Sequence, residues 1–429
     1  MANRRQHFKK VVDDCVNIYI KKTIVSYLKT VDWDADVHEP IAEKLFQAGM
    51  EAGGISLKAM QMMGNRHDLP APYAEKFSKA MENSVKKSSK EYVKKQCDNV
   101  EGLTDLDFEP FGCASVAQVH HGTFGGKKCV VKVLHEDIAE NYREDIKTMA
   151  ELGNYVDKYP EAKGAGVVLS GLSSKLLDII DSELNFQLER KNQERVAKGM
   201  LSCHEPLKIA EVFFANQSIM VMEKLEGITA AAALRRWENG EAIDVFDKKT
   251  RLQLYLGYAH MILTNNFCQV DPHPGNFMDI GGGNVALLDF GQCSSLSEEQ
   301  CERWKNFISL LPTADNNDTK DLIQRAFLEI GVDVQEKNAI NALKLLFFGQ
   351  GSGIFPHIDG VDQNYMSMII VMSYLSRFET NCNSFRAAVG LQEEEHDPFL
   401  LLKVFQDEIG LRNATLPDAP QKKRGWFFW

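Results

Sequence analysis

Short apolar runs separated by small-residue turns mark the middle of the chain. Residues 277–280 and 285–288 form one pair of runs, with Gly281-Gly282-Gly283-Asn284 between them. Glycine adopts the positive φ angles of a tight hairpin turn, so this pair predicts two antiparallel strands. Residues 111–119 predict a strand, a small-residue turn and a second strand. Another turn, at residues 124–127, leads into the apolar run 129–133.

Helical periodicity marks other segments. Residues 176–198 carry apolar side chains at a spacing compatible with one helical face. These side chains are Leu176, Leu177, Ile179, Ile180, Leu184, Phe186 and Leu188. Residues 219–222 predict a buried strand, and residues 295–411 are helix-rich by pattern. The polar segments 313–320 and 412–424 predict loops or linkers, and no apolar stretch reaches the ~18 residues of a transmembrane helix.

Length and composition agree with a folded globular protein of two lobes. The chain has 429 residues, of which 44% are hydrophobic and 25% charged. The 49 basic and 60 acidic residues give a formal net charge of −11, which argues against a nucleic-acid partner. Nine cysteines without a C-x-x-C pair indicate a reducing compartment: cytosol, mitochondrial matrix or stroma. The histidines lack zinc-site spacing and are interpreted as loop and core residues: His120, His121, His260 and His273.

Charge patterning adds little about targeting. Arg4, Arg5, Lys9 and Lys10 are soon followed by acidic residues, which does not support a long transit peptide. Residues 70–97 are rich in lysine and predict a basic helical surface, either a solvated face or a contact with a partner or anionic lipid.

The segment that carries most chemistry is Asp271-Pro272-His273-Pro274-Gly275-Asn276, followed by Asp289-Phe290-Gly291. An amide lies five residues after the first carboxylate, and a second carboxylate lies thirteen residues after the amide. Phosphoryl transfer from a nucleotide needs such a set: one acid orients the acceptor, and an amide and an acid hold magnesium. The predicted hairpin brings Asp289 back beside Asn276, so both reach one metal.

A single lysine, Lys132, interrupts the apolar run 129–133. A cation in a buried strand requires an anionic partner, and Glu183 and Glu189 both fall in the helical stretch 176–198. The order of strand, loop, strand, turn and lysine strand is that of a kinase small lobe. Small residues in the loop let backbone N–H groups approach phosphate oxygens. This loop runs through Gly112, Cys113, Ala114, Ser115, Val116 and Ala117. The strand 219–222 then runs into Glu223, where a kinase has its adenine-binding hinge.

These segments resemble the UbiB/ADCK (aarF domain-containing) family of atypical kinases, over roughly residues 50 to 390. Residues 58–61 and 65–70 are similar to the Lys-x-Gly-Gln signature and the segment that follows it. Residues 113–120 resemble the alanine-rich loop, and residues 183–189 resemble the Glu-x-Asp motif with the αC glutamate. The Asp271–Asn276 and Asp289–Gly291 segments match the catalytic and metal motifs closely.

The resemblance implies a role for each matching residue. Lys132 would contact the α- and β-phosphates and pair with Glu189. Asp271 would be the catalytic-loop carboxylate, and Asn276 and Asp289 the magnesium ligands. Lys58 and Gln61 would sit on a helical extension folded over the active site, with Lys58 near Glu183. Glu183 and Asn185, from the Glu-x-Asp motif, would complete this regulatory set. In the family this extension occludes the site of a protein substrate, which favours ATP hydrolysis or transfer to a small or lipid-like acceptor.

The sequence departs from the family pattern at three places. Met60 replaces the signature glycine, which predicts that its helix lies further from the loop it normally touches. Asn185 replaces the aspartate of Glu-x-Asp and removes one negative charge. Gly112-Cys113 stands where alanines dominate, which predicts a looser loop. These changes bear on regulation more than on nucleotide binding.

The predicted architecture is α+β: a protein-kinase-like two-lobed fold with an N-terminal helical extension. The extension comprises residues 1–105, the small lobe 106–225, and the mainly helical large lobe with its tail 226–429. The predicted function is Mg-dependent binding of ATP (or ADP) with hydrolysis or atypical kinase activity, and the resemblance implies support of isoprenoid-quinone or related lipid metabolism in a mitochondrion or plastid. A small-molecule phosphotransferase and a non-catalytic nucleotide-binding scaffold are the alternatives.

The last eight residues, Lys422-Lys423-Arg424-Gly425-Trp426-Phe427-Phe428-Trp429, combine three cations with four aromatic side chains. Cations approach anionic head groups and tryptophan favours the membrane interface, so this tail predicts a peripheral membrane contact. The alternative is that the aromatic side chains fold back onto the large lobe.

Overall fold

The computed structural model describes residues 9–15, 17–18, 34–52, 60, 71–78, 87–113, 116–156, 184–312, 319–334, 362–391 and 399–413. The chain divides into two compact units. The first comprises Met1–Lys191 and Glu211–Lys224, and the second comprises Asn192–Ala210 and Leu225–Trp429. Each unit is described by itself below. The predicted division of the chain into an extension, a small lobe and a large lobe, with boundaries at residues 105 and 225, remains a prediction.

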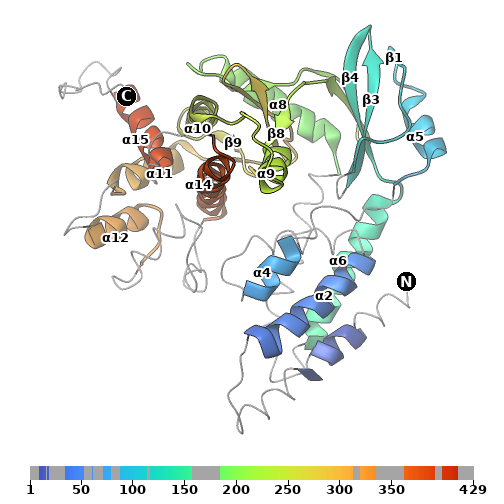
Figure 1. Ribbon diagram of the computed structural model, residues 1–429, viewed down its shortest axis with the longest axis horizontal. Helices are drawn as coiled ribbons and strands as arrows, with labels where there is room; N and C mark the ends of the chain where they lie inside the picture. The colour runs from blue at the N-terminus through green and yellow to red at the C-terminus, as the bar shows by residue number, and fades with distance from the viewer. Residues whose placement is uncertain are drawn as a thin grey trace. The chain divides into compact units, whose positions relative to one another are not determined.

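The sheet of the first unit is built around two antiparallel strands of equal length. β3 (Ala117–Phe124) pairs with β4 (Lys127–Leu134) along its whole length. β1 (Leu103–Thr104) and β2 (Gly112–Cys113) pair with β3. On the other side, β7 (Ile219–Glu223) pairs with β4, and β6 (Val212–Ala215) pairs with β7. Figure 1 labels β1, β3 and β4 of this sheet. The strands predicted at residues 111–133 and 219–222 are confirmed.

Sequence chemistry explains this sheet. Gly125 and Gly126 have φ angles of 55° and 82°, which lets the β3–β4 turn close in two residues. Alternation along β4 places Cys129, Val131 and Val133 on one fully buried face. That face packs against α5 (Lys90–Cys97), which begins at the N-cap Ser89.

The N-terminal helices of the first unit have their own small core. The π-helix η1 (Asp34–His38), α2 (Glu39–Ala52) and α4 (Ala71–Ser78) contact one another. Met60 is 3% exposed and packs with Phe77 in this core. A Cβ on Gly49 would lie 2.6 Å from the Met60 sulfur, so Met60 occupies space that a glycine leaves open. α6 (Ile138–Val156) follows β4.

The second unit contains the predicted glycine-rich hairpin. β10 (Phe277–Gly281) pairs with β11 (Asn284–Leu287), and Gly281, Gly282 and Gly283 all have positive φ angles. β8 (Ile228–Thr229) and β5 (Lys208–Ile209) complete a four-stranded sheet. β9 (Phe267–Gln269) and β12 (Cys293–Ser295) form a separate antiparallel pair. This pair brackets the segment from Asp271 to Asp289, and the predicted hairpin is confirmed.

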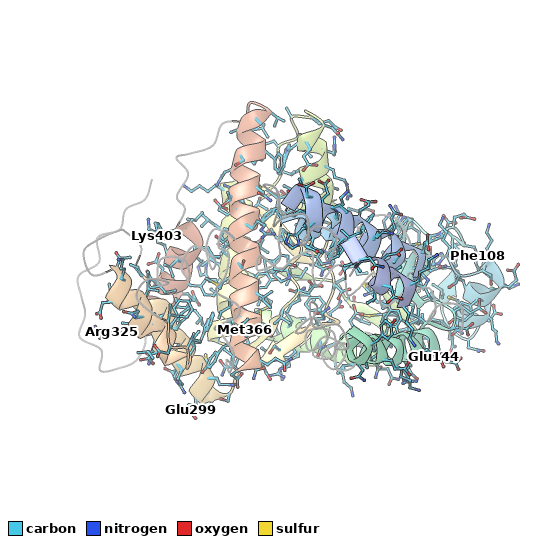
Figure 2. The ribbon with its side chains drawn as sticks, turned by 90° about the horizontal axis from the view of Figure 1, so that it is seen from below. Phe108, Glu144, Glu299, Arg325, Met366 and Lys403 are labelled. Carbon is cyan, nitrogen blue, oxygen red and sulfur yellow. The ribbon has the colours of Figure 1, made fainter. Side chains whose placement is uncertain are left out.

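Helices form most of the described part of the second unit. α9 (Ala230–Glu238) and α10 (Lys248–Leu263) precede the segment from Asp271 to Asp289. α11 (Glu298–Leu310), α12 (Thr319–Glu329), α14 (Gln363–Ala388) and α15 (Leu400–Asn413) follow it, and Figure 2 labels one residue on each: Glu299, Arg325, Met366 and Lys403. Their apolar faces form one core with Leu254, Phe277 and Trp304. The helix-rich pattern of residues 295–411 is confirmed over its described residues.

Some predicted boundaries were wrong. Thr319 and Lys320 belong to α12, and residues 412–413 belong to α15, so the polar segments are shorter than expected. α8 (Phe186–Met200) begins at Phe186, and residues 176–183 lie outside the described residues. No described helix is long and apolar enough to cross a membrane.

Candidate functional site

Lys132 forms the predicted ion pair in the first unit. Its neighbours Val131 and Val133 are fully buried on one face of β4, so Lys132 points to the other face. There Lys132 Nζ lies 2.6 Å from Glu189 Oε1, and the two side chains are 13% and 5% exposed. The ammonium also lies 5.3 Å from the centre of the Phe186 ring. Of the two candidate glutamates, Glu189 makes the contact, and Glu183 lies outside the described residues.

Asn185 organises the start of the helix that carries Glu189. Its backbone carbonyl accepts hydrogen bonds from Leu188 N and Glu189 N, at 2.9 and 3.1 Å. Its side-chain Oδ1 accepts from Gln187 N at 3.1 Å. An asparagine side chain that bonds the backbone two residues on is typical of a helix start. The residue that departs from the family's aspartate therefore supports the first turn of α8.

The predicted nucleotide-covering loop joins β2 to β3. Gly112 is opposite Val119, and Cys113 is opposite Gln118. Val116 O accepts a hydrogen bond from His135 N at 2.9 Å, and Ala117 is buried. Ala114 and Ser115 lie outside the described residues, as do Lys58 and Gln61.

Glu223 ends β7 and has its backbone N–H bonded to Glu211 O at 2.8 Å. Its side-chain Oε2 accepts from Glu211 N at 3.1 Å. The predicted hinge residue thus also closes the β6–β7 ladder, and its N–H already has an acceptor within the protein.

An amide network holds the segment Asp271–Asn276 of the second unit. Asn276 Nδ2 donates to Asp271 O at 2.9 Å and lies 3.5 Å from Asp271 Oδ2. Gln269 Nε2 donates to the same carbonyl at 2.7 Å, and Tyr258 OH donates to Gln269 Oε1 at 2.6 Å. Burial raises the pKa of Tyr258 well above its usual value, so the phenol stays a donor. Sequence reasoning missed Gln269 and Tyr258.

His273 lies over the turn that follows Asp271. Its Nδ1 accepts from Gly275 N at 2.9 Å, and its Nε2 lies 3.9 Å from Asp271 Oδ2. A Cβ on Gly275 would approach His273 Cε1 to 2.6 Å, so the turn requires glycine to keep this ring in place. His273 was interpreted as an ordinary loop residue, and the structure adds that it faces the Asp271 carboxylate.

The hairpin returns the chain to Asn276, as predicted. Leu288 N donates to Asn276 O at 2.9 Å, which brings the residue before Asp289 to Asn276. Asp289 Oδ1 accepts from Gly291 N at 2.9 Å, and Phe290 is fully buried in the core. The buried Phe290 ring and the hydrogen bond from Gly291 N together hold the Asp289 side chain in position.

The donor types fit a magnesium ion. Because Asn276 Nδ2 donates to a carbonyl, its Oδ1 is the end of the amide that remains for a cation. Magnesium in nucleotide sites takes one or two protein oxygens and completes its shell with phosphate and water. No group of three or more His, Cys, Asp or Glu side chains that would hold a metal occurs among the described residues.

Comparison with known proteins gives a consistent result. The sequence model of the ABC1 atypical kinase-like domain matches residues 75–325, more than half of the chain. The chain is 32% identical over 282 residues to AarF domain-containing kinase 1 of Drosophila melanogaster, covering 61% of this chain and 52% of that protein. It is 27% identical over 263 residues to the probable protein kinase UbiB of Vibrio parahaemolyticus, covering 58% and 47%.

A plant relative aligns over a shorter stretch. The chain is 26% identical over 205 residues to Protein ACTIVITY OF BC1 COMPLEX KINASE 8, chloroplastic, of Arabidopsis thaliana, covering 46% of this chain and 26% of that protein. The aligned part of the chain thus spans about half or less of the length of these relatives.

A solved structure shares the fold. The Rv3197–erythromycin complex from Mycobacterium tuberculosis superposes with a TM-score of 0.51 at 18% sequence identity, covering 82% of this chain and 96% of that chain. At this identity the likeness shows the fold alone. The predicted kinase-like α+β fold is confirmed.

Proposed function

Since the chain belongs to the ABC1 atypical kinase-like family, we propose that it binds ATP with magnesium and either hydrolyses it or transfers its terminal phosphate to a small or lipid-like acceptor. The family's kinase-like domain implies nucleotide binding. The observation that supports catalysis most is the Asp271–Asn276 amide contact, together with the bond from Leu288 N to Asn276 O.

Each residue of the site has a distinct proposed task. Lys132 holds the α- and β-phosphates, and Glu189 keeps its ammonium in place. Asp271 orients the acceptor and receives its proton. Asn276 and Asp289 hold magnesium, which neutralises charge on the phosphate oxygens when bound. The 2.6 Å Lys132–Glu189 pair and the donor types at Asn276 and Asp289 support these assignments.

The remaining assignments follow the family resemblance. Backbone N–H groups of Gly112, Cys113, Ala114, Ser115, Val116 and Ala117 cover the phosphates, and Glu223 lies at the adenine end. Lys58, Gln61 and Glu183 restrict access to the site. Asn185 acts with them through the first turn of α8, which the Asn185–Glu189 hydrogen bond supports.

Lipid chemistry is the proposed setting. We assign the chain to isoprenoid-quinone or related lipid metabolism in a mitochondrion or plastid, because relatives named UbiB and chloroplastic kinase align with more than 40% of it. The nine free cysteines fit a reducing compartment. The tail of residues 422–429, which lies outside the described residues, is proposed to touch an anionic membrane. Co-sedimentation with anionic liposomes, lost when the chain ends at Pro420, would support that contact.

Turnover of purified full-length protein tests the proposal. Asp271→Asn keeps the size and hydrogen bonding of the side chain but removes the charge that orients the acceptor. ATP turnover should fall by ~100-fold or more, while nucleotide binding persists. Equal residual turnover in the parent and the variant would remove Asp271 from catalysis and favour a nucleotide-binding scaffold.

A further inference from the structure

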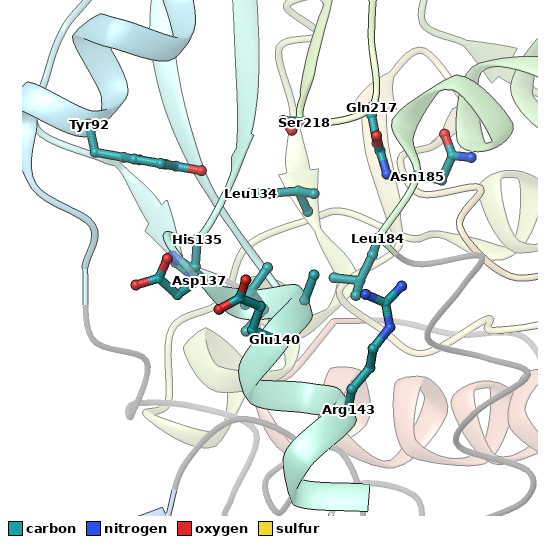
Figure 3. A pocket seen from close by; sticks show the side chains of 12 residues that line it. Tyr92, Leu134, His135, Asp137, Glu140, Arg143, Leu184, Asn185, Gln217 and Ser218 are labelled. Atoms are coloured by element: carbon teal, nitrogen blue, oxygen red, sulfur yellow. The ribbon is translucent and has the colours of Figure 1, made fainter.

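The first unit contains a cavity apart from the residues assigned to the nucleotide. Its volume is about 430 Å³, within the range of small-molecule pockets. Its walls are the end of β4, the first turns of α6, the turn between β6 and β7, and the residues just before α8 (Figure 3). Tyr92 of α5 closes one side. Among the described residues, none of those proposed to touch the phosphates lines it.

The cavity has an apolar floor and a charged rim. Leu134, Ile138 and Leu184 are 6%, 8% and 6% exposed and form the floor. The exposed side chains of Glu140 and Arg143 rise from α6 toward the cavity, less than one helical turn apart (Figure 3). No ion pair joins these two side chains in the described part of the chain. A carboxylate and a guanidinium that are not paired with each other therefore line the cavity together with these apolar side chains.

We propose that this cavity binds a small zwitterion with an apolar body, of the amino-acid type. Its ammonium would contact Glu140, and its carboxylate would contact Arg143. A guanidinium has five N–H donors, so Arg143 can keep its contacts within the protein and still bind a carboxylate. The apolar body would cover Leu134 and Leu184. Charge-assisted contacts at both ends make a zwitterion preferable to either singly charged analogue.

The same walls carry the residues that hold the Lys132–Glu189 pair. Leu134 follows Lys132 by two residues on β4, and its N–H donates to Ser218 O at 3.0 Å. Phe186 N, at the start of α8, donates to Gln217 O at 3.2 Å. A ligand that orders these walls also orders both ends of the ion pair, so its binding favours nucleotide binding. This regulatory step rests on the proposed nucleotide function, whereas ligand binding itself does not.

Three probes with one common apolar body test the ligand class. They are L-phenylalanine, 2-phenylethylamine, which lacks the carboxylate, and 3-phenylpropanoate, which lacks the ammonium. Calorimetry on the full chain without nucleotide should give binding of L-phenylalanine, with each singly charged analogue at least about tenfold weaker. Equal affinities for the three probes, or binding of none, would overturn the proposal.

Variants of the rim assign each end of the ligand. Glu140→Gln removes the partner of the ammonium, so L-phenylalanine should no longer bind more tightly than 3-phenylpropanoate. Arg143→Met removes the partner of the carboxylate, so L-phenylalanine should no longer bind more tightly than 2-phenylethylamine. Ala139→Leu, which fills the cavity without changing charge, should weaken the binding of L-phenylalanine. Glu144→Gln removes an acid from the same helix but not from the cavity wall, and should change nothing. A loss with Glu144→Gln as large as with Glu140→Gln would contradict a specific site.

The regulatory step has a separate measurement. Saturating L-phenylalanine should tighten ATP binding several-fold in the parent, and ATP should tighten L-phenylalanine binding by the same factor. Probe binding that leaves ATP affinity unchanged would refute the regulation and keep the site. A protein that binds the probes but no nucleotide would instead refute the proposed function, so the two failures are distinguishable.

Discussion

Breaking the Lys132–Glu189 pair should destabilise the first unit, and the two residues should be strongly coupled. Lys132→Met keeps the length of the side chain and leaves the Glu189 carboxylate, 5% exposed, without its 2.6 Å contact to an ammonium. Glu189→Gln keeps the shape and leaves the cation. Removing one member of a buried pair costs about 3–5 kcal/mol, because the remaining charge is then buried without this counter-ion.

The double variant Lys132→Met/Glu189→Gln carries neither charge. Its loss of unfolding free energy should fall short of the sum of the single losses by about 2 kcal/mol. Urea unfolding followed by far-ultraviolet circular dichroism measures all four proteins of the cycle. The Lys90–Glu109 pair is a matched control, since its atoms lie 2.8 Å apart but its side chains are 62% and 63% exposed. Exposed pairs are screened by water, so this control should show no resolvable coupling. Additive losses at Lys132 and Glu189 would refute the argument.

The remaining predictions concern stability. Glu379→Ala removes the carboxylate that Arg251 Nε contacts at 2.8 Å and that Tyr255 OH contacts at 2.6 Å. The free energy of unfolding in urea should fall by about 3–5 kcal/mol. A loss below about 1 kcal/mol would contradict this prediction. Burial lowers the pKa of His120 below its ordinary 6.5, so the unfolded chain binds this proton more readily. The contribution of neutral His120 to the free energy of unfolding should be complete above pH 6.5 and should decrease as the pH falls below that value. His120→Gln should flatten this dependence of stability on pH. An unchanged pH profile of stability in the variant would show that His120 does not contribute to it.

Local patterns were sufficient to predict the parts of the fold that local chemistry determines. Three successive glycines with positive φ angles determine the β10–β11 turn, and alternation along β4 determines that Lys132 faces away from the buried valines. The choice of Glu189 as partner came from the family resemblance. Periodicity alone left both Glu183 and Glu189 on the same helical stretch.

Tertiary contacts account for what the sequence did not reveal. Gln269 is the last residue of a three-residue strand, and its role depends on Tyr258 from α10, which is buried over most of its length. A helix buried on most sides shows no amphipathic period, so its inward residues cannot be ranked from sequence. The effect of Met60 also required a partner, since Gly49 supplies the space that its side chain fills.

The central claim is that Asn276 and Asp289 hold magnesium for a bound nucleotide, and one binding measurement tests it most directly. ATP should raise the unfolding temperature of the parent protein when magnesium is present, because a ligand that binds only the folded state stabilises it. Asp289→Ala should abolish the magnesium-dependent part of this shift. Asp321→Ala, an exposed acid on α12, should leave the shift intact. A magnesium-dependent shift that is the same in Asp289→Ala and in the parent would contradict the claim.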